Sequence, residues 1–308
     1  MNAARRSMAR APIQLTLPWS RLARERRSGG LVSVFDNDVK SWEHLAQTDP
    51  LWAVLSSDEF RGGALTPEAE DRFWRSGEEH VAHVISVIRN EITPDFEPGV
   101  SLDFGCGVGR NLVPLAERSR DAVGLDASST MVKRSEARAE ECGAANAHAL
   151  VIDRTIDAEA VAQWGPVDFV HSVLVFQHIV AAEGFELFDQ LLDVLAPGGH
   201  GFVQFHCHDP GGEFVRAIRE LRLRHRWFNS LVVRSRLRPL TDSLVMLYEY
   251  DVLELLGHLA AHRIADVVLE RTEAGPGGYD VRLYFAKFAG SDAEFDRSGR
   301  PMKLRVRP

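Results

Sequence analysis

The feature that most constrains the fold is a glycine-rich segment between residues 100 and 112. A short apolar run, 100–104, is followed by glycines at alternate positions and then by a helical pattern. Glycine permits backbone angles that a Cβ forbids, and it lets a ligand approach bare main chain. The segment therefore predicts a strand, a tight turn and a helix N-terminus, at the edge where doubly wound α/β folds bind nucleotides. The three glycines are Gly105, Gly107 and Gly109.

The spacing of these glycines differs from that of a dinucleotide-binding turn. Such turns favour Gly-x-Gly-x-x-Gly, whereas this chain has Gly-x-Gly-x-Gly preceded by Asp103. A carboxylate there would repel a phosphate and would suit a ligand with a cationic, amino-acid-like end. A second acid, Asp126, closes the next apolar run, 122–125, where it is placed to accept both hydroxyls of a ribose.

These residues resemble the first two motifs of the class I S-adenosylmethionine-dependent methyltransferases. Residues 102–110 (Leu-Asp-Phe-Gly-Cys-Gly-Val-Gly-Arg) and 123–126 (Val-Gly-Leu-Asp) carry the resemblance. Residues 167–172 are similar to the family's fourth strand, and residues 195–199 to the turn before its fifth. The resemblance covers roughly residues 97 to 288 and implies a Rossmann-like α/β fold with a seven-stranded, mostly parallel sheet and an antiparallel last strand.

The resemblance also implies which residues bind S-adenosylmethionine and the product S-adenosylhomocysteine. Asp103, Gly105 and Gly107 are expected to approach the methionyl end. The ribose is expected at Asp126 and the adenine amine at Asp153. The other residues predicted to contact the cofactor are Cys106, Ala127, Arg154 and Arg110, the last as a partner of the methionine carboxylate or, alternatively, as a surface arginine at a helix start.

From residue 100 onward, apolar runs alternate with helical patterns, which predicts a mostly parallel sheet. Pro114 is expected to shorten or kink the first helix of this core. A later amphipathic helix, 251–262, precedes two strands joined by a glycine-rich hairpin turn. The expected strands are 100–104, 122–125, 147–152, 167–172, 201–205, 265–271 and 279–288, and the expected helices between the first five are 111–118, 129–141 and 184–195.

The chain before the core divides into two segments. Residues 1–30 carry seven arginines against one glutamate and are predicted to be a mobile basic segment, or alternatively an arm that contacts a polyanion or another subunit. Residues 31–98 are predicted to form a helical extension that packs on the sheet or covers the cofactor as a lid. In it, Asp49-Pro50 separates two short helices, and a longer helix capped by Thr66 is expected to break near Gly77.

Bulk properties narrow the class of protein. The net charge is −8, and outside the basic first 30 residues it is about −14, which disfavours a nucleic-acid binder. No apolar run approaches the roughly 20 residues of a membrane span. Three cysteines without a disulfide or Cys-x-x-Cys pattern indicate a reducing cytoplasm. An oligomer is compatible with the sequence.

A long basic connection, 209–250, lies between the fifth strand and the helix at 251–262, within the predicted core of residues 99–288. One hypothesis is an acceptor-side insertion whose arginines hold a carboxylate or phosphate of the acceptor. The alternative is a solvated helical face or a subunit contact. Residues 289–308 are predicted to be a loose tail. The arginines are Arg216, Arg219, Arg222, Arg224, Arg226, Arg234, Arg236 and Arg238.

A hydroxyl acceptor would use a general base, and histidine suits this role near neutral pH. The candidates are His178, which matches a position that often shapes the donor pocket in this family, His206 and His208. His206-x-His208-Asp209 is only a weak match to a metal site, and no metal is predicted. Asp168 is expected to be structural.

The sequence thus predicts a methyltransferase acting on a small molecule, expected in secondary metabolism, with oxygen as the first acceptor atom and nitrogen or carbon open. The fourth strand is followed by Val-Phe-Gln-His instead of Asn/Asp-Pro-Pro-Tyr or Pro-Cys, which disfavours methylation of nucleic-acid bases. One alternative is a methyltransferase for peptide side chains or carboxyl groups. Another, of a different class, is a protein that binds S-adenosylmethionine without catalysis.

Overall fold

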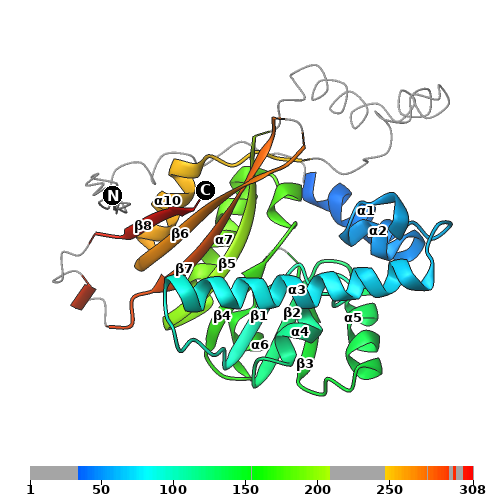
Figure 1. The fold of residues 1–308 in the computed structure, drawn as a ribbon, viewed down its shortest axis with the longest axis horizontal. Helices are drawn as coiled ribbons and strands as arrows, with labels where there is room; N and C mark the ends of the chain where they lie inside the picture. The colour runs from blue at the N-terminus through cyan, green and yellow to red at the C-terminus, as the bar shows by residue number, and fades with distance from the viewer. Residues whose placement is uncertain are drawn as a thin grey trace, which may run out of the picture.

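The strands predicted after the glycine-rich turn form the centre of one sheet (Figure 1). The computed structural model describes residues 34–153, 155–208, 247–275, 277–290, 294–295 and 301–307. Strand order is β3-β2-β1-β4-β5-β7-β6-β8, and β7 runs antiparallel to β5 and β6. The strands are β1 (Val100–Phe104), β2 (Asp121–Asp126), β3 (Ala147–Val151), β4 (Val167–Ser172), β5 (Leu195–His208), β6 (Ile264–Glu273), β7 (Tyr279–Lys287) and β8 (Lys303–Arg307).

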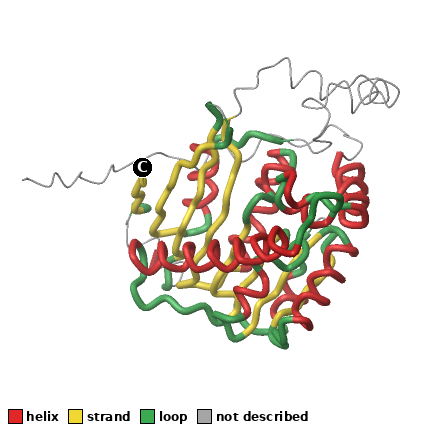
Figure 2. The backbone as a smooth tube through the Cα atoms, turned by 45° about the vertical axis from the view of Figure 1, so that its right-hand side comes forward, coloured by secondary structure: helices red, strands yellow, loops and turns green. Residues whose placement is uncertain are grey.

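Helices cover both faces of this sheet. On one face, α3 crosses the strands, as Figure 2 shows, together with α4 and α5, and on the other lie α6, α7 and α10. The helices α1, α2 and the 3-10 turn η2 form a smaller cluster beside α5. The bounds are α1 (Val34–Thr48), α2 (Pro50–Val54), η2 (Asp58–Phe60), α3 (Pro67–Glu91), α4 (Leu112–Ala116), α5 (Ser129–Glu141), α6 (Ala158–Ala162), η3 (Phe176–His178), α7 (Ala181–Val194) and α10 (Val252–Ala261).

The apolar spacing of the sequence explains which helix faces are buried. The α3 stripe, from Val81 to Ile88, packs on Phe169, Phe202 and Tyr284 of the sheet. Each such side chain contributes about 1.5–3 kcal/mol when it leaves water. Because β1, β2, β3 and β4 run parallel to one another, their carboxyl ends lie at one common edge of the sheet.

The predicted break of α3 near Gly77 is wrong, because the helix continues through that residue to Glu91. Thr66 caps the helix as expected, its Oγ1 accepting from the Ala69 N–H (3.2 Å). A Cβ on Gly77 would lie 2.1 Å from the carbonyl oxygen of Arg110. This glycine therefore serves close packing between α3 and the turn after β1.

The C-terminal segment was predicted as a loose tail, and this is wrong for residues 303–307. They form β8, which pairs in parallel with β6 and adds an eighth strand to the seven expected. Asp266 of β6 forms ion pairs with Arg305 and Lys303 of β8. The arginines of this strand face β6, where Arg307 also pairs with Glu270, whereas the apolar Val306 is 67% exposed.

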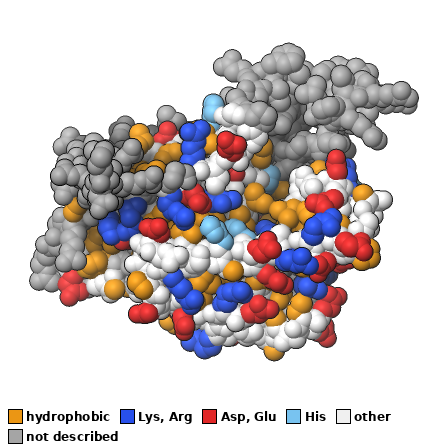
Figure 3. All heavy atoms as spheres, in the orientation of Figure 1, with side chains coloured by type: hydrophobic (Ala, Val, Ile, Leu, Met, Phe, Trp, Pro, Cys, Tyr) orange, Lys and Arg blue, Asp and Glu red, His pale blue; other side chains and the backbone are white. Residues whose placement is uncertain are grey.

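The remaining departures concern element lengths. Pro114 leaves only a five-residue helix, α4, where eight residues were expected. Strand β5 begins six residues earlier than expected, at Leu195. Among the described helices, none has the length and apolar character of a bilayer-spanning segment. On the face seen in Figure 3, acidic and basic side chains of the described residues are interspersed.

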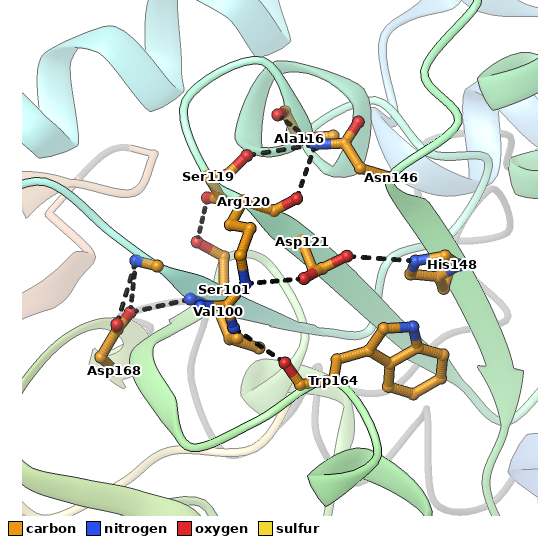
Figure 4. Close-up of polar contacts among 11 residues, drawn as sticks. Val100, Ser101, Ala116, Ser119, Arg120, Asp121, Asn146, His148, Trp164 and Asp168 are labelled. Atoms are coloured by element: carbon orange, nitrogen blue, oxygen red, sulfur yellow. Dashed lines mark hydrogen bonds and ion pairs between the residues drawn. The ribbon is translucent and has the colours of Figure 1, made fainter.

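The amino ends of the central strands are fixed by polar contacts (Figure 4). Asp168 accepts from the N–H groups of Gly99 (2.8 Å) and Val100 (3.1 Å), so its expected structural role is confirmed. Asn146 Nδ2 donates to the carbonyl of Ala116, the last residue of α4 (2.8 Å), and to those of Ser119 and Arg120 in the connection to β2. These contacts hold the edge opposite the candidate site.

Candidate active site

The glycine-rich turn after β1 folds as its sequence requires. Gly105 and Gly107 have φ angles of 75° and 54°, which L side chains rarely adopt. A Cβ on Gly105 would lie 2.2 Å from Val175 Cγ2. The turn is held by N–H groups of Gly105 and Cys106, which both donate to the Leu125 carbonyl (2.7 and 3.0 Å). The main chain of the turn therefore packs closely on Val175 and is held by hydrogen bonds beside the end of β2.

Asp126, at the end of β2, faces this turn. Its Oδ2 accepts from the Gly107 N–H (2.9 Å) and its Oδ1 from the Ser128 N–H (2.8 Å). Burial raises the pKa of Asp126 to about 6, although these two hydrogen bonds lower it. A carboxylate offers about four acceptor positions. Two therefore remain for hydroxyl donors of a ligand.

A cavity opens at the carboxyl ends of β1, β2, β3 and β4, and part of its wall comes from α1 and α2. Its lining combines carboxylates with a larger set of apolar side chains, such as Met131 and Ile152. Five of the nine residues predicted to contact the cofactor line this cavity, and so does the candidate base His178. The five are Gly105, Gly107, Asp126, Ala127 and Asp153.

Asp103 is buried next to the turn, outside the cavity lining. Its side chain is 2% exposed, and Oδ1 accepts from His171 Nδ1 on the adjacent strand β4 (2.7 Å). A neutral His171 that donates at Nδ1 accepts at Nε2, where His80 of α3 lies 3.0 Å away. The pKa of His80 lies well below its usual value, mainly because the ring is buried and next because His171 is close to it. Asp103 Oδ2 has no hydrogen-bond partner among the described residues.

Arg110 and Cys106 are also buried and also lie outside the cavity lining. Arg110 Nη1 donates to Ser76 Oγ (3.2 Å), so the alternative of a surface arginine is wrong. Burial lowers the pKa of Arg110 to about 10, against the opposing effect of Asp103. The Cys106 thiol points toward Gly124, on which a Cβ would lie 2.7 Å from Sγ. A contact from the Cys106 side chain to a ligand in the cavity therefore has no support in this geometry.

The three candidate histidines lie in different surroundings. His178, in η3, accepts at Nε2 from the Gln177 side-chain amide (2.9 Å) and lines the cavity. His206, 4% exposed, contacts Asp280 Oδ1 through Nδ1 (2.8 Å). His208 lies 4.0 Å from Glu249. The structure thus brings only His178, of the three, into the cavity wall.

Several lining residues were missed from the sequence. Trp42 of α1 meets the His178 ring edge-on, with 5.0 Å between centroids. Leu174, after β4, has a φ of 62°, a strained value for a non-glycine residue. Glu183 of α7 also lines the cavity. Trp42 lies more than 130 residues before His178 in the chain, so no local pattern could have paired them.

Glu43 holds α1 against α5 beside Asp126. Its carboxylate accepts from Ser128 Oγ (2.6 Å), Thr130 Oγ1 and the Thr130 N–H (3.3 Å). Hydrogen bonds from Ser128 and then Thr130 lower the pKa of Glu43 to about 2. The carboxylate also sits at the N-terminus of α5, where negative charge is favourable. The position of Trp42 therefore depends on this contact.

Some predicted residues lie outside the described residues. These are Arg154 and the arginines of the insertion, 216–238. Within the described part of the chain, no three His, Cys, Asp or Glu side chains group as metal ligands.

Parts of the sequence are similar to known proteins. Residues 102–199 match a family model described as a methyltransferase domain. A stretch of 88 residues is 34% identical to a 23S rRNA (uracil(1939)-C(5))-methyltransferase of Stenotrophomonas maltophilia, covering 28% of this chain and 18% of that protein. A stretch of 166 residues is 28% identical to a ubiquinone biosynthesis O-methyltransferase of a Caulobacter species, covering 50% of this chain and 64% of that protein. The chain thus spans less than two thirds of both relatives.

Solved structures share the fold. Magnesium protoporphyrin IX methyltransferase from Synechocystis, determined with bound SAH, superposes with a TM-score of 0.52 at 20% identity, covering 81% of this chain and 99% of that one. The predicted Rossmann-like fold is thereby confirmed. Residues 102–199 thus match a methyltransferase domain, and the chain shares its fold with a methyltransferase determined with bound SAH.

Proposed function

We propose that this chain is an S-adenosylmethionine-dependent methyltransferase for a small-molecule acceptor, with oxygen the first acceptor atom and nitrogen or carbon next. The observation that carries the proposal is Asp126, which lies in the cavity under the glycine-rich turn with two acceptor positions left. The ubiquinone biosynthesis O-methyltransferase that the chain resembles supports oxygen. A cytoplasmic location and an origin in secondary metabolism remain part of the proposal.

The residues present fit the donor. Asp126 would accept the two ribose hydroxyls, while Asp153, exposed at the cavity rim, would accept from the adenine amine. At the other end, Asp103 Oδ2 and Arg110 Nε are both buried without a described partner. An ammonium and a carboxylate on one ligand would satisfy an acid and a guanidinium in this way. Small shifts of the turn would be needed to reach them, since neither lines the cavity.

The proposed chemistry is an in-line displacement. The bound donor would supply a methyl group already activated by a sulfonium sulfur. The protein's part is to align the acceptor with that methyl group and to exclude water. His178 is the proposed base for a hydroxyl acceptor. For this, the Gln177 amide would leave His178 Nε2, and Nε2 would then accept the proton of the acceptor hydroxyl.

Binding of the donor product tests the proposal. S-adenosylhomocysteine titrated calorimetrically into the full chain should bind, and Asp126→Asn should weaken it at least tenfold, about 1.4 kcal/mol. Asp121→Asn, at the other end of β2, is the matched control and should leave the dissociation constant unchanged. Equal affinity for the wild type and Asp126→Asn would contradict the proposed site.

A turnover assay separates the remaining alternatives. Release of S-adenosylhomocysteine should be measured on panels of hydroxylated small molecules and of peptides. Turnover only with peptides would favour the peptide methyltransferase. Binding without turnover on either panel would favour the non-catalytic binding protein. The interspersed charges on the face in Figure 3 do not favour a nucleic-acid backbone as the acceptor.

A further inference from the structure

A second cavity lies directly beside the donor cavity. It is enclosed by α1, α2, η2, the segment after β4 and Leu247, and its volume is about 430 Å³. This volume falls in the range of small-molecule sites. The two cavities share five lining residues and therefore adjoin each other. The shared wall consists of Trp42, Ala53, Val54, Leu174 and His178.

The chemistry of the second cavity differs from that of the first. Among the described residues, its lining has no Asp, Glu, Lys or Arg, whereas the donor cavity contains Asp126, Asp153 and Glu183. Its polar lining is limited, in the same part of the chain, to Gln177, His178 and two serines, 56 and 57. The rest is aliphatic and aromatic. The side chains that set this second cavity apart from the first are Leu45, Trp52, Leu55, Phe60 and Leu247.

Among the described residues, Arg61 is a basic group that contacts the Trp52 side chain of this cavity. Arg61 stacks over the Trp52 ring, with 4.3 Å between Cζ and the centroid, and its Nε lies 3.3 Å from Asp58 Oδ1. Arg61 is not part of the cavity lining. An anionic ligand in this cavity would therefore lose water without gaining a counter-charge from the described lining, which is unfavourable. A neutral ligand carries no such cost.

Among the residues that line both cavities, His178 is the one whose ring nitrogen can accept a proton. His178 contributes to both cavities, and its Nε2 is held by the Gln177 amide. The backbone oxygen of Gln177 accepts from the Tyr248 N–H (2.8 Å), so the end of the 209–250 connection holds this turn. Leu174, in the same wall, keeps its strained backbone. Strain of this kind is concentrated at ligand-binding sites.

From this arrangement we propose that the second cavity binds the methyl acceptor, and that the acceptor is an uncharged, planar aromatic molecule bearing a hydroxyl group. This inference rests on the proposed function. The ring packs on the aromatic lining around Trp52, and the hydroxyl lies at His178. The hydroxyl oxygen bonds to the methyl carbon as the carbon–sulfur bond breaks, and the hydroxyl proton passes to His178 Nε2. This acceptor class differs from the anionic one predicted from the arginine-rich insertion.

Two ring-matched probes test the proposal, 2-naphthol and 2-naphthalenesulfonate. Each is titrated calorimetrically into the full chain saturated with S-adenosylhomocysteine. We expect 2-naphthol to bind at least tenfold more tightly than the sulfonate. Trp52→Ala should weaken 2-naphthol at least tenfold, and Trp52→Phe should restore most of the affinity. Trp164→Ala, at the opposite edge of the sheet, is the control and should change neither probe.

The outcomes distinguish this inference from the proposed function. Trp52 does not line the donor cavity, so S-adenosylhomocysteine should bind Trp52→Ala with wild-type affinity, which also shows that the variant folds. Tighter binding of the sulfonate, or unchanged 2-naphthol affinity in Trp52→Ala, would overturn the inference. So would the absence of binding by both probes. If the wild-type chain did not bind S-adenosylhomocysteine at all, that result would instead contradict the proposed function.

Discussion

Asp103 and His171 show how single residues behind the glycine-rich turn support it. Both side chains are almost fully buried, and their contact of 2.7 Å joins β1 to β4. The carboxylate has no other hydrogen-bond partner among the described residues. Since a buried carboxylate without a donor is strongly unfavourable, the imidazole is needed wherever Asp103 is ionised. The sequence placed Asp103 at the methionyl end but carried no signal for His171, because the pairing depends on strand register.

Replacing His171 should therefore destabilise the protein. His171→Ala leaves both carboxylate oxygens without a donor and should lower the free energy of unfolding by about 3 kcal/mol. Asn can donate from its side-chain amide, so His171→Asn should recover part of the loss. Urea unfolding followed by circular dichroism measures both. Wild-type stability in His171→Ala would show that the contact is not important for the fold.

Asp126 gives a pH dependence to ligand binding. Its pKa in the folded protein is about 6, above the ordinary value of 3.8, so it accepts protons as the pH falls through 6. The protonated acid offers fewer acceptor positions to a ribose. Affinity for S-adenosylhomocysteine should fall about tenfold from pH 7.5 to pH 5, as expected when about nine tenths of the groups are protonated. The sign is opposite for folding: below about pH 4 the raised pKa of Asp126 has no cost, and as the pH rises toward 6 ionisation of the buried carboxyl lowers the stability of the folded protein.

Asp126→Asn provides the control for this titration. The amide cannot titrate, so the variant should bind weakly with little change across the same pH range. Calorimetric titration at four pH values measures the effect in both proteins. An unchanged affinity of the wild type between pH 7.5 and pH 5 would contradict the assignment of Asp126 to the ligand.

At the scale of elements, α1 is held on the core by polar contacts with α5 in addition to the apolar packing of Ala46. Glu43 accepts from Ser128 and Thr130, and Arg134 Nε donates to the Ala46 carbonyl (3.1 Å). The pKa of Glu43, about 2, lies below its ordinary value of 4.5. The stabilisation is therefore complete above pH 4.5 and is lost as the pH falls toward 2.

Glu43→Gln should loosen α1 without unfolding the sheet. Partial exposure limits the contribution of these hydrogen bonds to about 1 kcal/mol. Amide hydrogen exchange in residues 40–48 should therefore become about fivefold faster at pH 7, while exchange in β1 stays constant. Glu91→Gln, at the exposed end of α3, is the control. Equal exchange in both variants would show that Glu43 does not hold α1.

The elements that the sequence predicted best are those set by local rules. Thr66, Pro67 and the apolar stripe identified α3, and the alternate glycines identified the turn after β1. The break expected at Gly77 was wrong, because that glycine serves packing against Arg110, 33 residues away. Strand β8 was missed because an edge strand takes its partner from tertiary structure. Local patterns therefore located most of the sheet, but contacts between distant segments determined its edge.

In the whole molecule, the candidate site also combines residues that local patterns predicted with residues that only contacts between distant segments bring there. Gly105, Gly107, Asp126, Ala127, Asp153 and His178 line the donor cavity, and all follow strands at the common edge of the sheet. This could be predicted, because βα connections bring the carboxyl ends of parallel strands together. The contribution of Trp42 could not, because it depends on how α1 folds over that edge, and the left-handed backbone of Leu174 has no glycine to signal it.

The edge strand β8 lies far across the sheet from the candidate site, so its removal should affect stability and ligand binding differently. A chain ending at Arg300 lacks β8, which leaves the backbone groups of β6 unpaired at an open edge. It also loses the Asp266 ion pairs with Arg305 and Lys303. The truncated protein should be about 1–3 kcal/mol less stable and should associate at high concentration, as light scattering would show. The cavities lie at the ends of β1 to β4, five strands from this edge at β1, so affinity for S-adenosylhomocysteine should remain unchanged. A loss of affinity in the folded, monomeric truncated chain would show that β8 supports the site as well as the sheet.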